Sequence, residues 1–130
     1  VSGTTVNVPS SFTAIGKGAF KEESNITSIT VPESVVAIEE SAFNKCRALT
    51  AMVLPSSLNT IELQTFYYCT ALTTVVLPPS LTTIKRWAFT ACAALTNIYL
   101  PSSITSIEEN AFEDCVQLGE DHEEQVHNIR

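Results

Sequence analysis

The chain has 130 residues, of which 45% are apolar and only 16% are charged, so it can bury the core of one compact domain. The formal charge of −7 argues against nucleic acid and anionic membrane surfaces as partners, and no apolar run approaches the roughly 18 residues needed for membrane insertion. Up to Ile107, six acidic residues balance six basic ones, whereas from Glu108 onward eight acids face only Arg130. The acidity therefore belongs to one end of the chain.

Four residue types recur at a spacing of 23 residues, which indicates stacked structural repeats. The columns are prolines (Pro9, Pro32, Pro55, Pro78, Pro101), phenylalanines (Phe20, Phe43, Phe66, Phe89, Phe112), isoleucines (Ile15, Ile38, Ile61, Ile84, Ile107) and, from the second unit on, cysteines (Cys46, Cys69, Cys92, Cys115). A unit of this size cannot bury its apolar side alone, so its stability must come from contacts with its neighbours. The sequence predicts a solenoid of about five 23-residue repeats.

Each repeat begins with a short segment in which apolar residues alternate with exposed positions, as in a strand. The predicted strands are Ile29–Val31, Met52–Leu54, Val75–Leu77 and Ile98–Leu100. A proline follows each of them and ends it, because proline cannot donate to a strand ladder. Strands of successive repeats are expected to pair in parallel, about 4.8 Å apart, in one narrow sheet.

The second half of each repeat carries the apolar pattern A-F-x-x-C-x-x-L, which follows an extended stretch with Leu58 and Ile61 pointing inward. Apolar spacings of three and four predict one or two helical turns. Glu39–Glu40 and Glu108–Glu109 precede two of these turns and are interpreted as charges that favour the positive end of a helical turn. The predicted fold class is therefore α/β, with short parallel strands on the concave face and short helical turns on the convex face.

The cysteine spacing of 23 matches no zinc-binding pattern. Helical turns stacked roughly 8–10 Å apart would also hold the cysteines beyond the Cα separation of about 7 Å that a disulfide allows. We therefore predict a column of small, buried, unpaired thiols that packs inside the solenoid.

The repeat pattern stops near the C-terminal end. Asp121 and Glu123 occupy the positions at which a further strand would need inward-facing apolar residues. The solenoid is therefore predicted to span residues 1–118, and residues 119–130 are predicted to form an acidic cap or tail.

The residue types that carry catalysis are not arranged for it. A nucleophilic serine needs a base within reach, and His122 and His127 both lie in the terminal segment, outside the repeats. The pattern H-x4-H in an acidic segment is a weak metal signature, and we interpret both histidines as solvated. The sequence predicts a protein that is not an enzyme and has no metal or other cofactor.

The combined pattern resembles the BspA-type leucine-rich repeats, which have a 23-residue unit with proline after the strand and the A-F-x-x-C motif. The resemblance covers residues 5–118, and in the fourth unit Cys92 and Leu95 are followed by Ile98, Leu100 and Pro101 in the register of that family. It implies a curved solenoid, a cell-surface or secreted setting and binding to a protein partner.

The main candidates for partner binding are the outward positions of the predicted strands. They form two uncharged rows on the predicted concave face: Thr30, Val53, Val76 and Tyr99 in one, and Ser28, Ala51, Thr74 and Asn97 in the other. One interpretation is a neutral, partly apolar docking face with Tyr99 as its anchor. The other is that valine, threonine and tyrosine simply suit strands.

A second candidate surface lies on the predicted convex side, where Tyr67, Tyr68 and Trp87 are expected to face solvent. Exposed aromatic side chains close to one another can mark a docking patch, or they can fill space between neighbouring turns. The function predicted first is a non-catalytic adhesion or recognition module that binds a protein through the concave face. The alternative is a structural or scaffolding subunit of a larger assembly, held through these aromatics or the solenoid ends.

Overall fold

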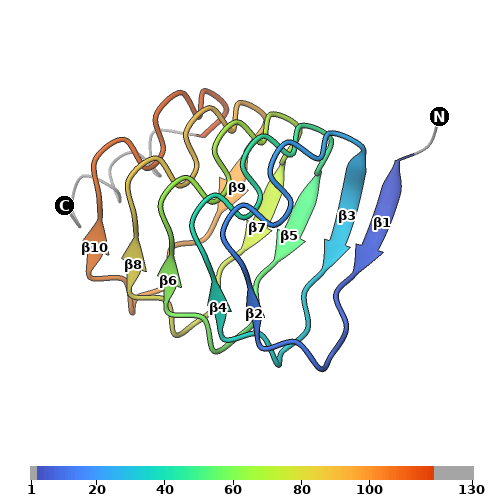
Figure 1. Cartoon of the computed structure of the whole chain (residues 1–130). Helices are drawn as coiled ribbons and strands as arrows, with labels where there is room; N and C mark the ends of the chain where they lie inside the picture. The colour runs from blue at the N-terminus through green and yellow to red at the C-terminus, as the bar shows by residue number, and fades with distance from the viewer. Residues whose placement is uncertain (1–2, 119–130) are drawn as a thin grey trace.

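The computed structural model describes residues 3–118, which form a stack of 23-residue turns, here called rungs. One side of the stack is a five-stranded parallel sheet with the order β1-β3-β5-β7-β9. Its strands are β1 (Thr4–Asn7), β3 (Ile26–Thr30), β5 (Ala51–Val53), β7 (Thr74–Val76) and β9 (Asn97–Ile98). Figure 1 shows them as neighbouring arrows with a common direction, which confirms the predicted parallel solenoid.

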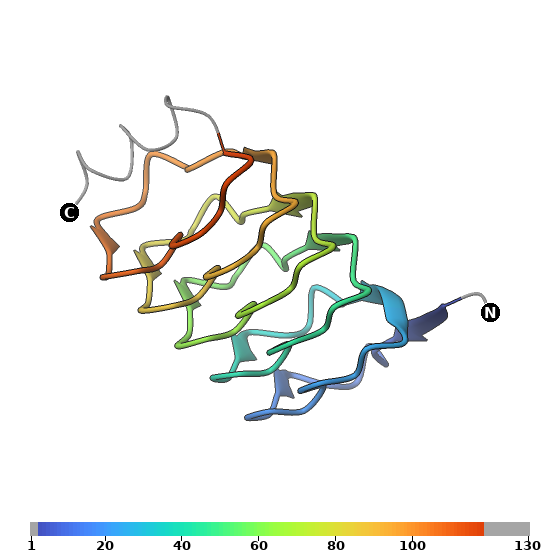
Figure 2. The same ribbon diagram turned by 90° about the horizontal axis from the view of Figure 1, so that it is seen from above.

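A second set of very short strands lies across the rungs from this sheet. It consists of β2 (Ala14–Ile15), β4 (Ala37–Ile38), β6 (Thr60–Ile61), β8 (Thr83–Ile84) and β10 (Ser106–Ile107). β2 pairs with β4, and β6, β8 and β10 form a three-stranded parallel sheet, with each isoleucine beside the isoleucine 23 residues away. Viewed from above, the rungs follow one another as a series of similar loops (Figure 2).

The core is one continuous cluster that runs the length of the stack. Phe43, Phe66 and Phe89 are fully buried, and Phe20 and Phe112 lie half-buried at its two ends. Neighbouring rings in this column are stacked, with centroids 5.2–5.6 Å apart. Each inner ring therefore contacts one ring above and one below, and its burial depends on both neighbouring rungs.

The prediction of helical turns is wrong, because residues 3–118 contain no helix. The segment that carries the A-F-x-x-C motif, here called the turn side, runs along the top of Figure 1 as a series of tight turns. In the second rung, Ala42, Asn44 and Cys46 donate their N–H groups to carbonyls three residues earlier. The residues between them donate to the next rung instead, as Phe43 does to the Thr65 carbonyl at 3.0 Å. Short-range turns produce the same apolar spacing as a helix, which explains the error.

Two positions per rung on the turn side adopt a left-handed backbone. One column comprises Gly18, Ser41, Gln64, Trp87 and Asn110, and the other comprises Glu22, Lys45, Tyr68, Ala91 and Asp114, all with φ between 57° and 64°. This conformation costs an L-residue roughly 1–2 kcal/mol, and glycine is the residue that adopts it most readily. The bonds between rungs offset that cost, because they satisfy backbone groups that an isolated turn would leave unpaired.

The cysteines are unpaired, as predicted, but the geometric reason given for it was wrong. The turns stack at a strand-like spacing and not at the 8–10 Å expected for helices, as the phenylalanine column shows. Each thiol instead donates to the carbonyl of a phenylalanine in the preceding rung, as Cys69 Sγ does to Phe43 O at 3.1 Å and Cys92 Sγ to Phe66 O at 3.2 Å. The thiols therefore add to the bonding between rungs.

Candidate protein-binding face

The exposed surface of the β1–β9 sheet, here called the sheet face, carries the outward strand residues named by the sequence. Ser28, Thr30, Ala51, Val53, Thr74, Val76 and Tyr99 are all exposed. Asn97 has its backbone in β9, and its side chain lies outside the described part of the structure. The period-two alternation of the strands produces this exposure, because Met52 and Val75 between them are buried.

Parallel pairing brings the outward residues of neighbouring strands side by side. Ser28 lies opposite Ala51, Ala51 opposite Thr74 and Val53 opposite Val76. The two rows thus run straight across the sheet from rung to rung. They contain no charged residue, so a partner can cover this face without removing a charged side chain from water.

Three large apolar or aromatic side chains on this face are strongly exposed. Val53 is 62% exposed, Val76 is 50% exposed and Tyr99, directly after β9, is 79% exposed. Other exposed large hydrophobic residues, such as Val36 and Val116, belong to different parts of the rungs. The sheet face therefore combines aligned apolar side chains with small polar neighbours.

A ladder of threonine hydroxyls at the start of the strands was missed by the sequence analysis. Thr27, Thr50, Thr73 and Thr96 each donate to the carbonyl of the residue 23 positions earlier, over 3.1–3.4 Å. A column of threonines at a 23-residue spacing, directly before the outward strand position, was the available signal. The ladder adds side-chain hydrogen bonds between rungs beside the sheet face, so it holds the rows in register.

The aromatic residues of the turn side are less exposed than expected. Tyr67 and Trp87 are half-buried, and Tyr68 is 37% exposed. The rings of Tyr67 and Tyr68 pack against each other with centroids 4.6 Å apart, and the Arg86 guanidinium lies 5.6 Å from the Trp87 ring centroid. Much of the surface of these residues is thus already in contact with neighbours within the chain.

Several charged side chains on the outside connect neighbouring rungs. Lys17 Nζ lies 2.8 Å from Glu40 Oε1, and Lys85 Nζ lies 3.8 Å from Glu62 Oε1. The hydrogen bond to Glu40 and its charge raise the pKa of Lys17. Glu108 accepts a hydrogen bond from the Arg86 backbone N–H at 3.1 Å. Glu40 and Glu108 therefore contact the preceding rung, and the interpretation as helix-start charges is wrong because no helix begins there.

Within residues 3–118, no group of three or more histidine, cysteine or acidic side chains could hold a metal ion. His122 and His127 lie outside the described residues. The described part likewise contains no helix that is long and apolar enough to cross a membrane.

A hollow of about 180 Å³ opens at the N-terminal end of the stack, lined by apolar side chains that include Val8, Phe12 and Phe20.

A sequence model described as "BspA type Leucine rich repeat region (6 copies)" matches residues 2–119. The chain belongs to the BspA-type leucine-rich repeat family. Leucine-rich repeats of this kind generally serve as protein-interaction modules, and their fold is typically non-catalytic. No curated protein matches this BspA-type chain.

Solved structures of bacterial leucine-rich repeat proteins resemble this BspA-type chain. A leucine-rich cell surface protein from Faecalibacterium prausnitzii is 31% identical with a TM-score of 0.80, over 89% of this chain and 38% of that one. A protein from Bacteroides ovatus is 32% identical with a TM-score of 0.84, over 88% and 32%. A T. pallidum protein is 27% identical with a TM-score of 0.71, over 96% and 69%. The chain thus spans about a third of the length of the first two.

Proposed function

We propose that this chain is a protein-binding module that docks its partner on the sheet face. The observation that carries the proposal is the aligned, strongly exposed group of Val53, Val76 and Tyr99 on a surface without charged residues. Aromatic and apolar side chains at the centre of an interface supply most of its binding energy, while charged residues are depleted there. Hydrogen-bonded rungs hold the side chains in place before binding, which reduces the entropy lost on association.

The role in adhesion or recognition at a cell surface, or in secreted form, is part of the same proposal. It is supported by the similarity to the leucine-rich cell surface protein of Faecalibacterium prausnitzii. Brief protease treatment of intact source cells tests it, because a surface-displayed chain is cleaved while a cytoplasmic marker protein survives. Survival of the chain in intact cells together with cleavage after lysis would contradict the surface setting.

The binding face can be tested with peptides selected from a random phage-displayed library on the immobilised full chain. Val76→Glu places a charge among apolar side chains, so we expect it to weaken most selected binders at least about tenfold. Tyr99→Ala removes the proposed anchor and should have a similar effect. Both positions are exposed, so thermal unfolding of the two variants should match that of the parent.

Trp87→Ala is the matched control, because it removes an aromatic side chain from the turn side. Under the proposal it leaves binding unchanged. Binders that tolerate Val76→Glu and Tyr99→Ala but are lost on Trp87→Ala would contradict the proposal. They would favour the alternative of a structural subunit held through Tyr67, Tyr68 and Trp87. The contacts that these three residues already make within the chain place that alternative second.

A further inference from the structure

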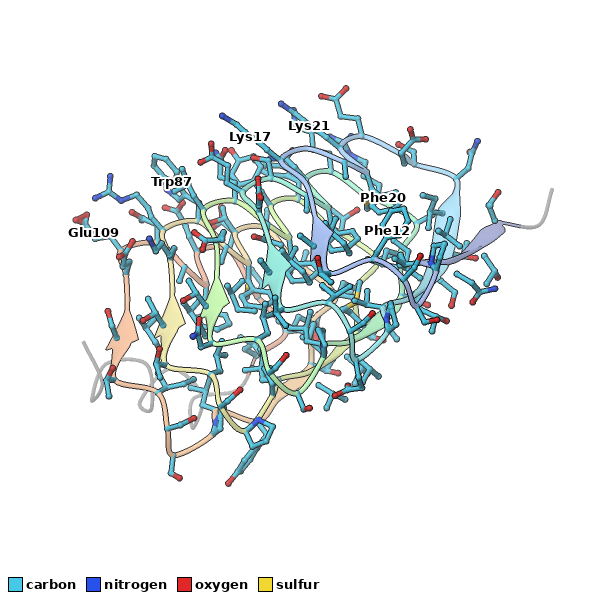
Figure 3. All side chains as sticks on the ribbon, turned by 60° about the horizontal axis from the view of Figure 1, so that its bottom comes forward. Phe12, Lys17, Phe20, Lys21, Trp87 and Glu109 are labelled. Atoms are coloured by element: carbon cyan, nitrogen blue, oxygen red, sulfur yellow. The ribbon has the colours of Figure 1, made fainter. Side chains whose placement is uncertain are left out.

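Charge is distributed unevenly around the solenoid. Within residues 3–118, every charged side chain except that of Glu33 lies on the turn side or directly before it. These charged residues fall in the ranges 17–23, 39–47, 62, 85–86 and 108–114. Lys17, Lys21 and Glu109 are three of them, and Figure 3 shows them along the turn side. The sheet face lies on another side of each rung, so its rows hold no charge that could pair with a charge on a partner.

Glu33, the exception, is already bonded within the chain. It follows Pro32, and its carboxylate accepts hydrogen bonds from the hydroxyl and the backbone N–H of Ser56 in the next rung. The bond from the hydroxyl and then the bond from the backbone lower the pKa of Glu33. Both carboxylate oxygens therefore bond to the neighbouring rung and do not make the sheet face anionic.

The polar side-chain groups of the sheet face include uncharged hydroxyls that are available to a partner. Those of Ser28, Thr30 and Thr74 form no hydrogen bond with any group in residues 3–118, whereas the Thr73 hydroxyl beside them donates to the Thr50 carbonyl at 3.1 Å. Each available hydroxyl can donate one hydrogen bond and accept others. They stand in the same two rows as the exposed apolar side chains of this face, so both kinds of group meet one partner surface.

We propose that the partner presents an uncharged protein segment to the sheet face, an inference that rests on the proposed function. The apolar side chains of this segment cover Val53, Val76 and Tyr99, and its amide or hydroxyl groups bond to the available hydroxyls of the rows. A charged side chain at the contact would lose its water and meet no opposite charge, and such an unpaired buried charge strongly opposes binding. Because the face offers a counter-charge to neither sign, it rejects lysine and glutamate alike.

Peptides that are selected on the immobilised full chain and lost on Val76→Glu are the probes, because that loss places them on the sheet face. At each peptide position where alanine weakens binding, lysine and glutamate should each weaken it at least about tenfold beyond alanine. Glutamine, which is of similar size without a charge, should stay within about threefold of alanine. Lysine and glutamate versions that differ by more than about tenfold would overturn the inference, because the face would then discriminate by the sign of the charge.

Salt gives an independent readout. Dissociation constants from isothermal titration calorimetry should change by less than about twofold between about 0.05 and 0.5 M NaCl, because the contact contains no ion pair that salt could screen. K45E/R47E, which reverses two charges of the turn side, is the control and should bind the same peptides within about twofold of the parent.

Two kinds of failure can be told apart. A loss of affinity of about tenfold in salt, or on K45E/R47E, would overturn the uncharged partner and leave the sheet face as the docking site. Such a result would indicate an acidic or a basic segment as the occupant. If no selected peptide is weakened by Val76→Glu or by Tyr99→Ala, the proposed function itself fails, and this inference fails with it.

Discussion

The sheet side and the turn side of this solenoid achieve the same stacking with different backbones. On the sheet side, Val53 and Val76 pair in ordinary parallel strands, and every second side chain faces inward. On the turn side, successive N–H groups donate alternately to a carbonyl of their own turn and to a carbonyl of the next rung. Residues with a left-handed backbone, such as Gln64, lie in these turns. The comparison shows that apolar spacing reports which side chains face the core, whereas the path of the backbone depends on where its hydrogen bonds go.

The largest expected effect tests whether the rungs above and below bury the core side chains of the turn side. Phe66→Ala removes a fully buried ring with stacked neighbours on both sides, so we expect the free energy of unfolding to fall by about 3–5 kcal/mol. Phe112→Ala is the matched control. That ring is half-buried, so its removal should lower the free energy of unfolding clearly less. Urea denaturation measures both. Equal costs for the two variants would mean that the rungs do not bury each other.

Much of the fold could be predicted from residues that recur at equal spacing. Phe66, Cys69 and Pro78 marked the repeat, and the alternation around Val75 marked a strand with one exposed face. The left-handed turns could not be predicted, because Gln64, Trp87 and Lys45 have no preference for that conformation, and only the stacked neighbours stabilise it. The residues of the sheet face are exposed where alternation placed them, while their role in binding remains a proposal.

The buried thiols of the turn side should make the free energy of unfolding fall at alkaline pH. Burial raises the pKa of Cys46 to about 11, above its value in the unfolded chain of about 8.5. The folded state therefore holds the proton more tightly. The contribution of the protonated Cys46 thiol to the free energy of unfolding is complete below about pH 8.5 and is lost as pH rises through 11. Urea midpoints should fall over this window, and they should fall less in Cys46→Ala. Identical pH profiles for parent and variant would show that this thiol is not buried.

A smaller effect is expected at Asn44, which is 4% exposed and whose Oδ1 has no hydrogen-bond partner within the described residues. Two rungs later, the hydroxyl of the equivalent Thr90 donates to the Asn110 carbonyl at 2.6 Å. Asn44→Thr should therefore stabilise the protein by about 1 kcal/mol, because it replaces an unsatisfied buried group with a bonded one. Thr90→Asn, the reverse change, should destabilise it. If Asn44→Thr lowers the thermal midpoint, the two positions are not equivalent.

A pair of glycine substitutions, compared by urea denaturation, tests most directly whether the sheet side and the turn side stack with different backbone conformations. Gln64→Gly lies at a left-handed position, where glycine removes strain, so we expect a gain of about 1 kcal/mol. Thr74→Gly lies in strand β7 and should lose about 1 kcal/mol. Opposite signs for the two variants are the predicted result. A loss of stability in Gln64→Gly, as glycine causes inside a helix, would contradict the account.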